Sequence, residues 1–138
     1  MEGLEAAVEV RLAEPADYAA ISRIGKLVFR YETDVKRLQD ACVLVATYGK
    51  IVAGFAIASD ILVEGHTVIM SLAVHCEFRR CGIGTQLLET LQATAVLDQR
   101  PLIAMAALGD SRRMDFLQSV GFRVYQPKGD GLVLTWGK

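Results

Sequence analysis

The sequence predicts a single α/β domain of the α+β kind, with a mixed, mostly antiparallel sheet flanked by helices. The order of apolar strand-like and helix-like segments is β-α-(α)-β-β-β-α-β-α-β-β, so three consecutive strands precede a strand–helix–strand unit. The chain has 138 residues with 52% hydrophobic content, which suffices for one sizeable core. No linker or repeat divides it, so residues 1–138 are expected to form one domain.

The N-terminal half predicts a strand, a helix and an antiparallel meander. After the first strand, Pro15 ends the extended segment and Asp17 is placed to cap a helix. Apolar residues then recur at helical spacing from Tyr18 to Val28. The segment Arg30–Asp40 is polar and stays unassigned. The strands of this half are predicted at Val8–Leu12, Ala41–Tyr48, Ile51–Ser59 and His66–Val74.

The C-terminal half predicts two helices, a strand between them and a closing hairpin. The first helix starts at Gly82–Gly84 and continues with an apolar stripe of leucines. Asp110 or Ser111 caps the second helix, which stops at Gly121. The segments are the strand Leu102–Ala107, the helix Arg112–Val120, and the hairpin strands at Val124-Tyr125 and Leu132–Trp136 around the turn Lys128–Gly131.

Charge and cysteine content limit the function classes. Fifteen basic and sixteen acidic residues give a net charge of −1, without the clustered positive charge of generic nucleic-acid binding. No apolar run approaches the roughly 20 residues of a membrane span, and no signal peptide is recognisable. The odd count of three cysteines favours free thiols, and their spacing does not predict a metal site. We therefore expect a soluble cytoplasmic protein without a nucleic-acid, membrane or metal partner.

The most informative stretch is the loop between the third predicted strand of the meander and the helix that follows. It contains Arg79, Arg80, Gly82 and Gly84, and no acidic residue precedes Glu89 in the helix. Free N–H groups at a helix start attract anions, glycines allow close backbone approach, and arginines add charge-assisted hydrogen bonds. The stretch therefore predicts a site for a pyrophosphate. A surface turn, in which the glycines serve only the backbone geometry, is the alternative.

Two other phosphate-binding motifs are excluded. The dinucleotide fingerprint requires a third glycine where this chain has Leu87, and the phosphate-binding loop motif of nucleotide hydrolases is absent.

This region resembles the GNAT superfamily of N-acetyltransferases. The run Arg79–Gly84 is similar to their R/Q-x-x-G-x-G/A motif, and Leu72–His75 to their central strand. Asp110–Phe122 resembles their later motif N-x-x-A-x-x-F-Y-x-x-x-G-F. The similarity in element order extends from about Val8 to Trp136, and it implies a splayed sheet.

The resemblance implies that acetyl-coenzyme A binds as cosubstrate. Backbone groups of the central strand would pair with the pantetheine arm, and the glycine loop would hold the pyrophosphate. The implied coenzyme-binding residues are Leu72, Ala73, Val74, Arg79, Arg80, Cys81, Gly82, Ile83, Gly84 and Thr85.

The catalytic residues are not assigned by this resemblance, because three positions depart from the family pattern. Where members often have a tyrosine that protonates the thiolate, this chain has Leu117, whose side chain is expected to face the coenzyme sulfur. Met105 replaces the glutamate base of members that acetylate ribosomal-protein N-termini, and Asp110 replaces the asparagine. Acetyl transfer can still proceed largely through proximity.

Substitutes for these groups are few. His75 is a candidate because histidine is a common general acid or base, but a polar residue at a strand end is the competing interpretation. Tyr125 could reach the thiolate from the last hairpin, although core packing competes. Two further candidates lie by the loop that enters the third strand of the meander, Glu64 and His66, with a solvated loop as the alternative. The resemblance places three residues where the family usually shapes the acceptor site, with a charged surface segment as the alternative: Tyr31, Glu32 and Asp34.

The sequence thus predicts an N-acetyltransferase that acts on a primary amine of a small molecule or a protein, with a homodimer left open. The alternative is a non-catalytic acyl-coenzyme A-binding module, which Leu117 and Met105 favour. A third possibility is an interaction protein that keeps the fold but no longer binds the coenzyme. The intact glycine loop argues against it.

Overall fold

The computed structural model describes residues 8–29, 41–59, 65–79, 81–107 and 109–137. The segment Arg30–Asp40, which the sequence left unassigned, lies outside these ranges. All three cysteines are free. Within the described residues, no helix has the length and apolar character needed to cross a membrane.

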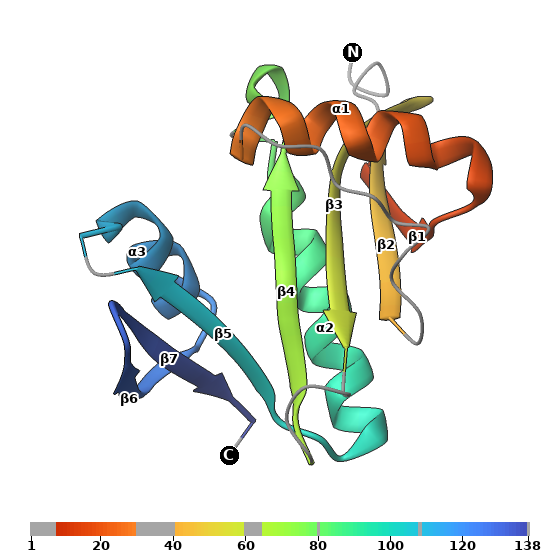
Figure 1. The fold of residues 1–138 in the computed structure, drawn as a ribbon. Coiled ribbons are helices and arrows are strands. Elements are labelled where there is room, and N and C mark those ends of the chain that lie inside the picture. The colour runs from red at the N-terminus through yellow and green to blue at the C-terminus, as the bar shows by residue number, and fades with distance from the viewer. Residues whose placement is uncertain (1–7, 30–40, 60–64, 80, 108, 138) are drawn as a thin grey trace.

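The structure is built on one seven-stranded mixed sheet in the order β1-β2-β3-β4-β5-β7-β6 (Figure 1). Among the described strands, only β4 and β5 are parallel neighbours; the other pairs are antiparallel, which confirms the predicted meander and mixed sheet. The strands are β1 (Val8–Leu12), β2 (Ala41–Tyr48), β3 (Ile51–Ser59), β4 (Thr67–Val74), β5 (Leu102–Ala107), β6 (Arg123–Lys128) and β7 (Gly131–Trp136).

The sheet splays open between β4 and β5. These strands pair only where Thr67 and Val68 meet Leu102 and Ile103, and beyond that point they diverge (Figure 1). Along the β3–β4 ladder the register shifts so that Met70 is an extra residue on β4. A bulge of this kind bends its strand and increases the local twist. The splayed sheet that the resemblance implies is therefore present.

Helices cover the two faces of the meander and create two core clusters. Helix α1 (Tyr18–Phe29) packs on one face through Ile21 and Ile24, against Phe55 of β3. Helix α2 (Ile83–Asp98) packs on the opposite face through the predicted leucine stripe. Because both faces of β3 are covered, its residues from Ala53 to Ser59 are all buried.

The connection from β1 to α1 is fixed by an ion pair. A 3-10 helix, η2 (Pro15–Asp17), precedes α1. Asp17 accepts two hydrogen bonds from the Arg11 guanidinium, at 2.7 and 3.0 Å, and one from the backbone N–H of Glu14 at 2.8 Å. The carboxylate therefore reaches back to η2 and β1, whereas the sequence predicted a cap on the following helix.

Helix α3 (Ser111–Ser119) lies beside the other half of the sheet, β5 and β7 (Figure 1). Asp110 is its N-cap, since its carboxylate accepts the N–H of Arg113 at 3.1 Å. At the other end of α3, the Gln92 side chain of α2 donates to the Val120 carbonyl at 2.9 Å. The predicted stop at Gly121 is confirmed by its φ of +100°, which favours glycine.

Candidate functional site

A cavity of about 770 Å³ lies between β4 and the start of α3, on the side where β5 diverges from β4. Four parts of the chain supply its walls: the end of α1, the strand β4, the loop that leads into α2, and the start of α3. The lining residues are Val28, Phe29, Met70, Ser71, Leu72, Ala73, Val74, Phe78, Arg79, Gly82, Gly84, Thr85, Asp110, Arg112, Arg113 and Phe116.

The wall formed by β4 presents unpaired backbone groups. The N–H of His75 donates to the Ala53 carbonyl of β3 at 2.8 Å, and backbone groups alternate sides along a strand. The backbone groups of Leu72 and Val74 therefore face away from β3, toward the cavity. The pairing of β4 with β5 ends at Val68, so these groups have no β5 partner. They can bind an extended ligand as an added strand would.

The start of α2 forms the second wall. Gly82 is the N-cap with a φ of +76°, and no side chain of the described residues caps this end. The first N–H groups of a helix have no partner within it, and the helix dipole makes this end positive. Because Gly82, Gly84 and Thr85 line the cavity, these donors are available to an anionic group within it.

The third wall is the face of α3 that carries Arg113 and Phe116, three residues apart and therefore on one side of the helix. A β carbon on Gly84 would lie 3.3 Å from Cζ of Phe116 and 3.7 Å from Cγ2 of Val74. Glycine at this position keeps the space between α2 and α3 open.

The charge of the described cavity lining is positive. Arg79, Arg112 and Arg113 contribute three guanidinium groups, and Asp110 is the single acidic residue. Burial lowers the pKa of Arg113, and the nearby Asp110 partly opposes this effect. Because an arginine remains protonated even so, the cavity suits an anionic ligand.

Most of the predicted coenzyme-binding residues come together here. Leu72, Ala73, Val74, Arg79, Gly82, Gly84 and Thr85 all line the cavity. Cys81 and Ile83 do not: Cys81 is half-buried against the core, and Ile83 belongs to it. Arg80 lies outside the described residues.

The expectation for Leu117 is wrong. Its side chain is 1% exposed, belongs to the core cluster, and does not line the cavity. Phe116 lines the cavity in its place. Met105, in the position of the family's glutamate, is 45% exposed. Its neighbours Ala104 and Ala106 are buried, so the Met105 side chain points away from the face of the sheet that these alanines pack against.

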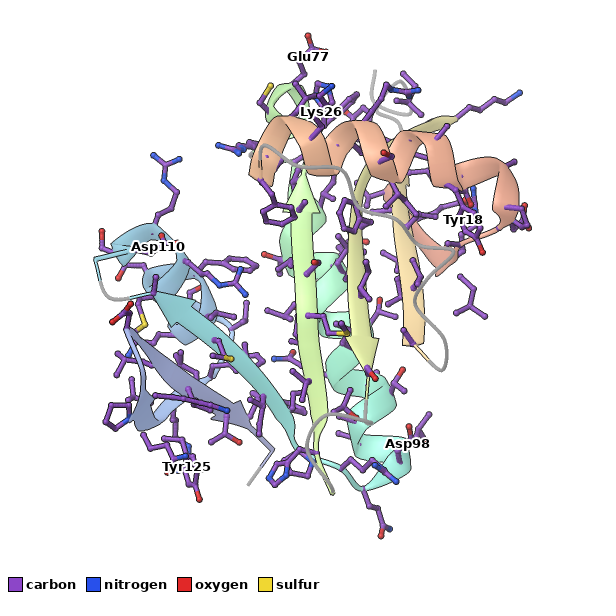
Figure 2. All side chains as sticks on the ribbon, in the orientation of Figure 1. Tyr18, Lys26, Glu77, Asp98, Asp110 and Tyr125 are labelled. Atoms are coloured by element: carbon purple, nitrogen blue, oxygen red, sulfur yellow. The ribbon has the colours of Figure 1, made fainter. Side chains whose placement is uncertain are left out.

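The other catalytic candidates lie outside the cavity lining. Tyr125 is 65% exposed, so the interpretation as a core residue is wrong, and with His66 it lines a second cavity of about 720 Å³. Figure 2 shows Tyr125 far from Asp110 at the start of α3. The Nδ1 atom of His75 accepts the N–H of Glu77 at 3.1 Å, so this side chain caps the 3-10 helix η4 (Cys76–Phe78). The candidates Glu64, Tyr31, Glu32 and Asp34 lie outside the described residues.

Sequence reasoning missed Arg113, Phe116 and Met70 as residues of the cavity. The spacing of Arg113 and Phe116 after the predicted cap at Asp110 was available as a signal, since it places both on one helix face. Met70 had no such signal, because its position depends on a bulge between two strands.

Comparisons with known proteins agree with this geometry. The sequence model described as "Acetyltransferase (GNAT) domain" matches residues 39–124. The ribosomal-protein-S18-alanine N-acetyltransferase of Escherichia coli is similar in structure, with a TM-score of 0.77 and 19% identity over 94% of this chain and 92% of that chain.

Two further structures have the same fold. The Paia N-acetyltransferase of Thermoplasma acidophilum, in complex with coenzyme A, has a TM-score of 0.78 and 16% identity, covering 94% of this chain and 98% of that one. Naa50 of Arabidopsis thaliana, in complex with the bisubstrate analogue CoA-Ac-MVNAL, has a TM-score of 0.75 and 16% identity, covering 94% and 97%.

No curated protein sequence is similar enough to count as a relative. The family model nevertheless spans more than half of the chain, and the similar structures share its fold. The chain therefore belongs to the GNAT family of acetyltransferase domains.

Proposed function

We propose that this protein transfers the acetyl group of acetyl-coenzyme A to a primary amine of a small molecule or a protein. The observation that carries the proposal is the cavity between β4 and the start of α3, which joins the open edge of β4 to the start of α2. The free thiols fit a reducing compartment, so we propose that the reaction takes place in the cytoplasm.

The residues present fit the coenzyme chemically. Backbone N–H groups at Gly84 and Thr85, with the Arg79 side chain at the cavity wall, suit a pyrophosphate. The open edge at Leu72 and Val74 suits the amide groups of a pantetheine arm. When bound, the coenzyme would supply an activated thioester, and the chain would orient it toward an amine.

Acid–base assistance from the described lining is small. Among the described residues, the lining contains no histidine, tyrosine, cysteine or glutamate, and its single carboxylate, Asp110, caps α3. Proximity and orientation alone can supply roughly 7–11 kcal/mol of a bimolecular barrier. This favours an acceptor amine with a substantial neutral fraction at neutral pH. An α-amino group, with a pKa of about 8, meets that condition better than a lysine side chain near 10.4.

The second candidate function is a non-catalytic module that binds acyl-coenzyme A. The specific observation in its favour is the burial of Leu117, because the position at which family members often carry a tyrosine presents no proton donor to the cavity. Such a module would bind the coenzyme with the same walls and release no product.

A transfer assay with a panel of amines separates the two functions. The purified chain is incubated with acetyl-coenzyme A and α-amino, ε-amino and aryl amines, and release of free thiol is followed together with the mass of the product. We expect acetylated product from at least one amine of low pKa. Calorimetric binding of acetyl-coenzyme A without transfer to any amine would instead support the non-catalytic module, and absence of binding would contradict both.

A further inference from the structure

Arg113 is held at the inner edge of β5 by a hydrogen bond that fixes its guanidinium group. Its Nε atom donates to the backbone carbonyl of Met105 at 2.7 Å. The carbonyl of Pro101 accepts the N–H of Thr67, so it faces β4, and alternation along the strand makes the Met105 carbonyl face the same way. The guanidinium group therefore lies on the side of β5 that borders the cavity, which it lines.

The Arg113 guanidinium lies at a different level of the cavity from the glycine loop, where the phosphates are expected to bind. Met105 lies two residues beyond Ile103, the last residue of β5 paired with β4, so it is level with Met70. The glycine loop follows Val74, four residues further along β4, or roughly 13 Å at about 3.3 Å per residue. In the proposed function, the thioester end of the coenzyme reaches the level of Arg113, whereas the phosphates stay at α2.

Most hydrogen-bonding capacity of the Arg113 guanidinium is unused among the described residues. Its four Nη–H donors make no hydrogen bond or ion pair with any residue in the described part of the chain. The carboxylate of Asp110 is engaged with the backbone N–H of Arg113, as the helix cap. A half-buried cation is favourable when it is paired and hydrogen-bonded, and a neutral acetyl group supplies no such partner.

We propose that Arg113 binds a carboxylate that one of the two substrates carries next to its reacting group. The planar fork of a guanidinium matches the two oxygens of a carboxylate, and the anchored Nε leaves one edge of that fork available. The inference rests on the proposed acyl transfer and narrows its substrates. The carboxylate belongs to one of two sources, a dicarboxylic acyl group on the donor or an amino-acid-like acceptor.

Two arms of one experiment distinguish these sources. In the donor arm, binding of succinyl-coenzyme A is compared by calorimetry with that of butyryl-coenzyme A, which has the same carbon count without the carboxylate. In the acceptor arm, transfer from acetyl-coenzyme A to phenylalanine is compared with transfer to phenethylamine. Each preference is measured in the wild type and in Arg113→Gln, so that the intrinsic reactivity of each amine cancels from the comparison.

The expected result is a preference for the carboxylated member in one arm, which Arg113→Gln lowers roughly 10- to 100-fold, the usual effect of losing hydrogen bonds to a charged group. Arg23→Gln removes the same charge from an exposed position of α1 that does not line the cavity, and it should keep the preference. Arg113→Lys, which retains the charge without the fork, should lower the preference less than Arg113→Gln. If thermal melts show that Arg113→Gln is unfolded, the preference of Arg113→Lys is compared with that of the wild type instead.

Three outcomes would overturn the proposal. The first is a wild type that binds acetyl-coenzyme A but shows no carboxylate preference in either arm, which leaves the proposed function intact. The second is an Arg113→Gln variant that weakens acetyl-coenzyme A as much as succinyl-coenzyme A, which would assign Arg113 to the coenzyme itself. The third is a wild type that binds no coenzyme, which would contradict both the proposed function and this inference.

Discussion

The Cζ atom of Phe116 lies 3.3 Å from the point at which a β carbon on Gly84 would stand. This approach brings the start of α2 against the cavity face of α3. A side chain larger than a methyl group at residue 84 would fill the space that this approach leaves for a ligand backbone or phosphate. The two residues therefore set the width of the cavity at its positively polarised end.

Gly84→Asp is expected to abolish binding of acetyl-coenzyme A while the fold survives. Its carboxylate would face the phosphates and fill space beside Phe116, so we expect affinity to fall by roughly 100-fold or more. Gly84→Ala, which requires only a small shift of the Phe116 ring, should retain most binding. Ala93→Asp places the same charge on an exposed position of α2 and serves as the control. A ligand-induced rise in melting temperature that persists in Gly84→Asp would refute the assignment.

Leu117→Tyr is expected to destabilise the protein without increasing its rate. The Leu117 side chain is almost fully buried, and inserting a larger residue into a packed core costs typically 1–3 kcal/mol. Urea denaturation measures the loss, and the transfer assay measures the rate. A faster transfer by a variant of unchanged stability would mean that residue 117 faces the coenzyme after all.

Tyr125→Phe is expected to leave the transfer rate within about twofold of wild type, because the side chain is exposed on β6 and does not line the cavity. Steady-state kinetics on an amine that is turned over well provide the measurement. A tenfold loss of rate with unchanged coenzyme affinity would identify Tyr125 as the acid, contrary to this account.

Asp17→Asn should lower the melting temperature at neutral pH, since it removes the ion pair with Arg11. The Asp17 side chain is 8% exposed and that of Arg11 40%. The hydrogen bond from Arg11 lowers the pKa of Asp17, so this stabilisation is complete above the ordinary value of about 3.9 and is lost as the pH falls through the lower folded value.

The difference in melting temperature between Asp17→Asn and wild type should therefore narrow in acid. Glu89→Gln, at an exposed position of α2, is the control and should change stability little. A difference that stays constant from pH 7 to pH 2 would show that the charge of Asp17 does not contribute.

The fold was largely predictable because its signals are local. The leucine stripe of α2, the cap at Asp110 and the stop at Gly121 each depend on residues a few positions apart, and each appears as predicted. The start of β4 moved by one residue, and β6 begins one residue earlier and ends three residues later than predicted. The 3-10 helix at Cys76–Phe78 was not predicted, since a single turn fixed by the His75 side chain leaves no periodic pattern.

The site was predictable on the β4 and α2 side and not on the α3 side. The glycine loop carries its chemistry in contiguous residues, whereas the orientation of Leu117 depends on how α3 rotates against the core. The placement of Arg113 depends on a hydrogen bond to Met105, eight residues earlier, and on the divergence of β5 from β4. These are tertiary relationships that spacing along the chain does not encode.

The central claim is that the cavity between β4 and the start of α3 binds acetyl-coenzyme A chiefly through its pyrophosphate at the start of α2. The most direct test is calorimetric titration of the purified chain with desulfo-coenzyme A, 3′-dephospho-coenzyme A and pantetheine. We predict that 3′-dephospho-coenzyme A, which lacks only the 3′-phosphate, binds more tightly than pantetheine, which lacks all phosphates. Pantetheine should bind at least about 100-fold more weakly than the full coenzyme. Pantetheine that binds as tightly as the full coenzyme would contradict the claim.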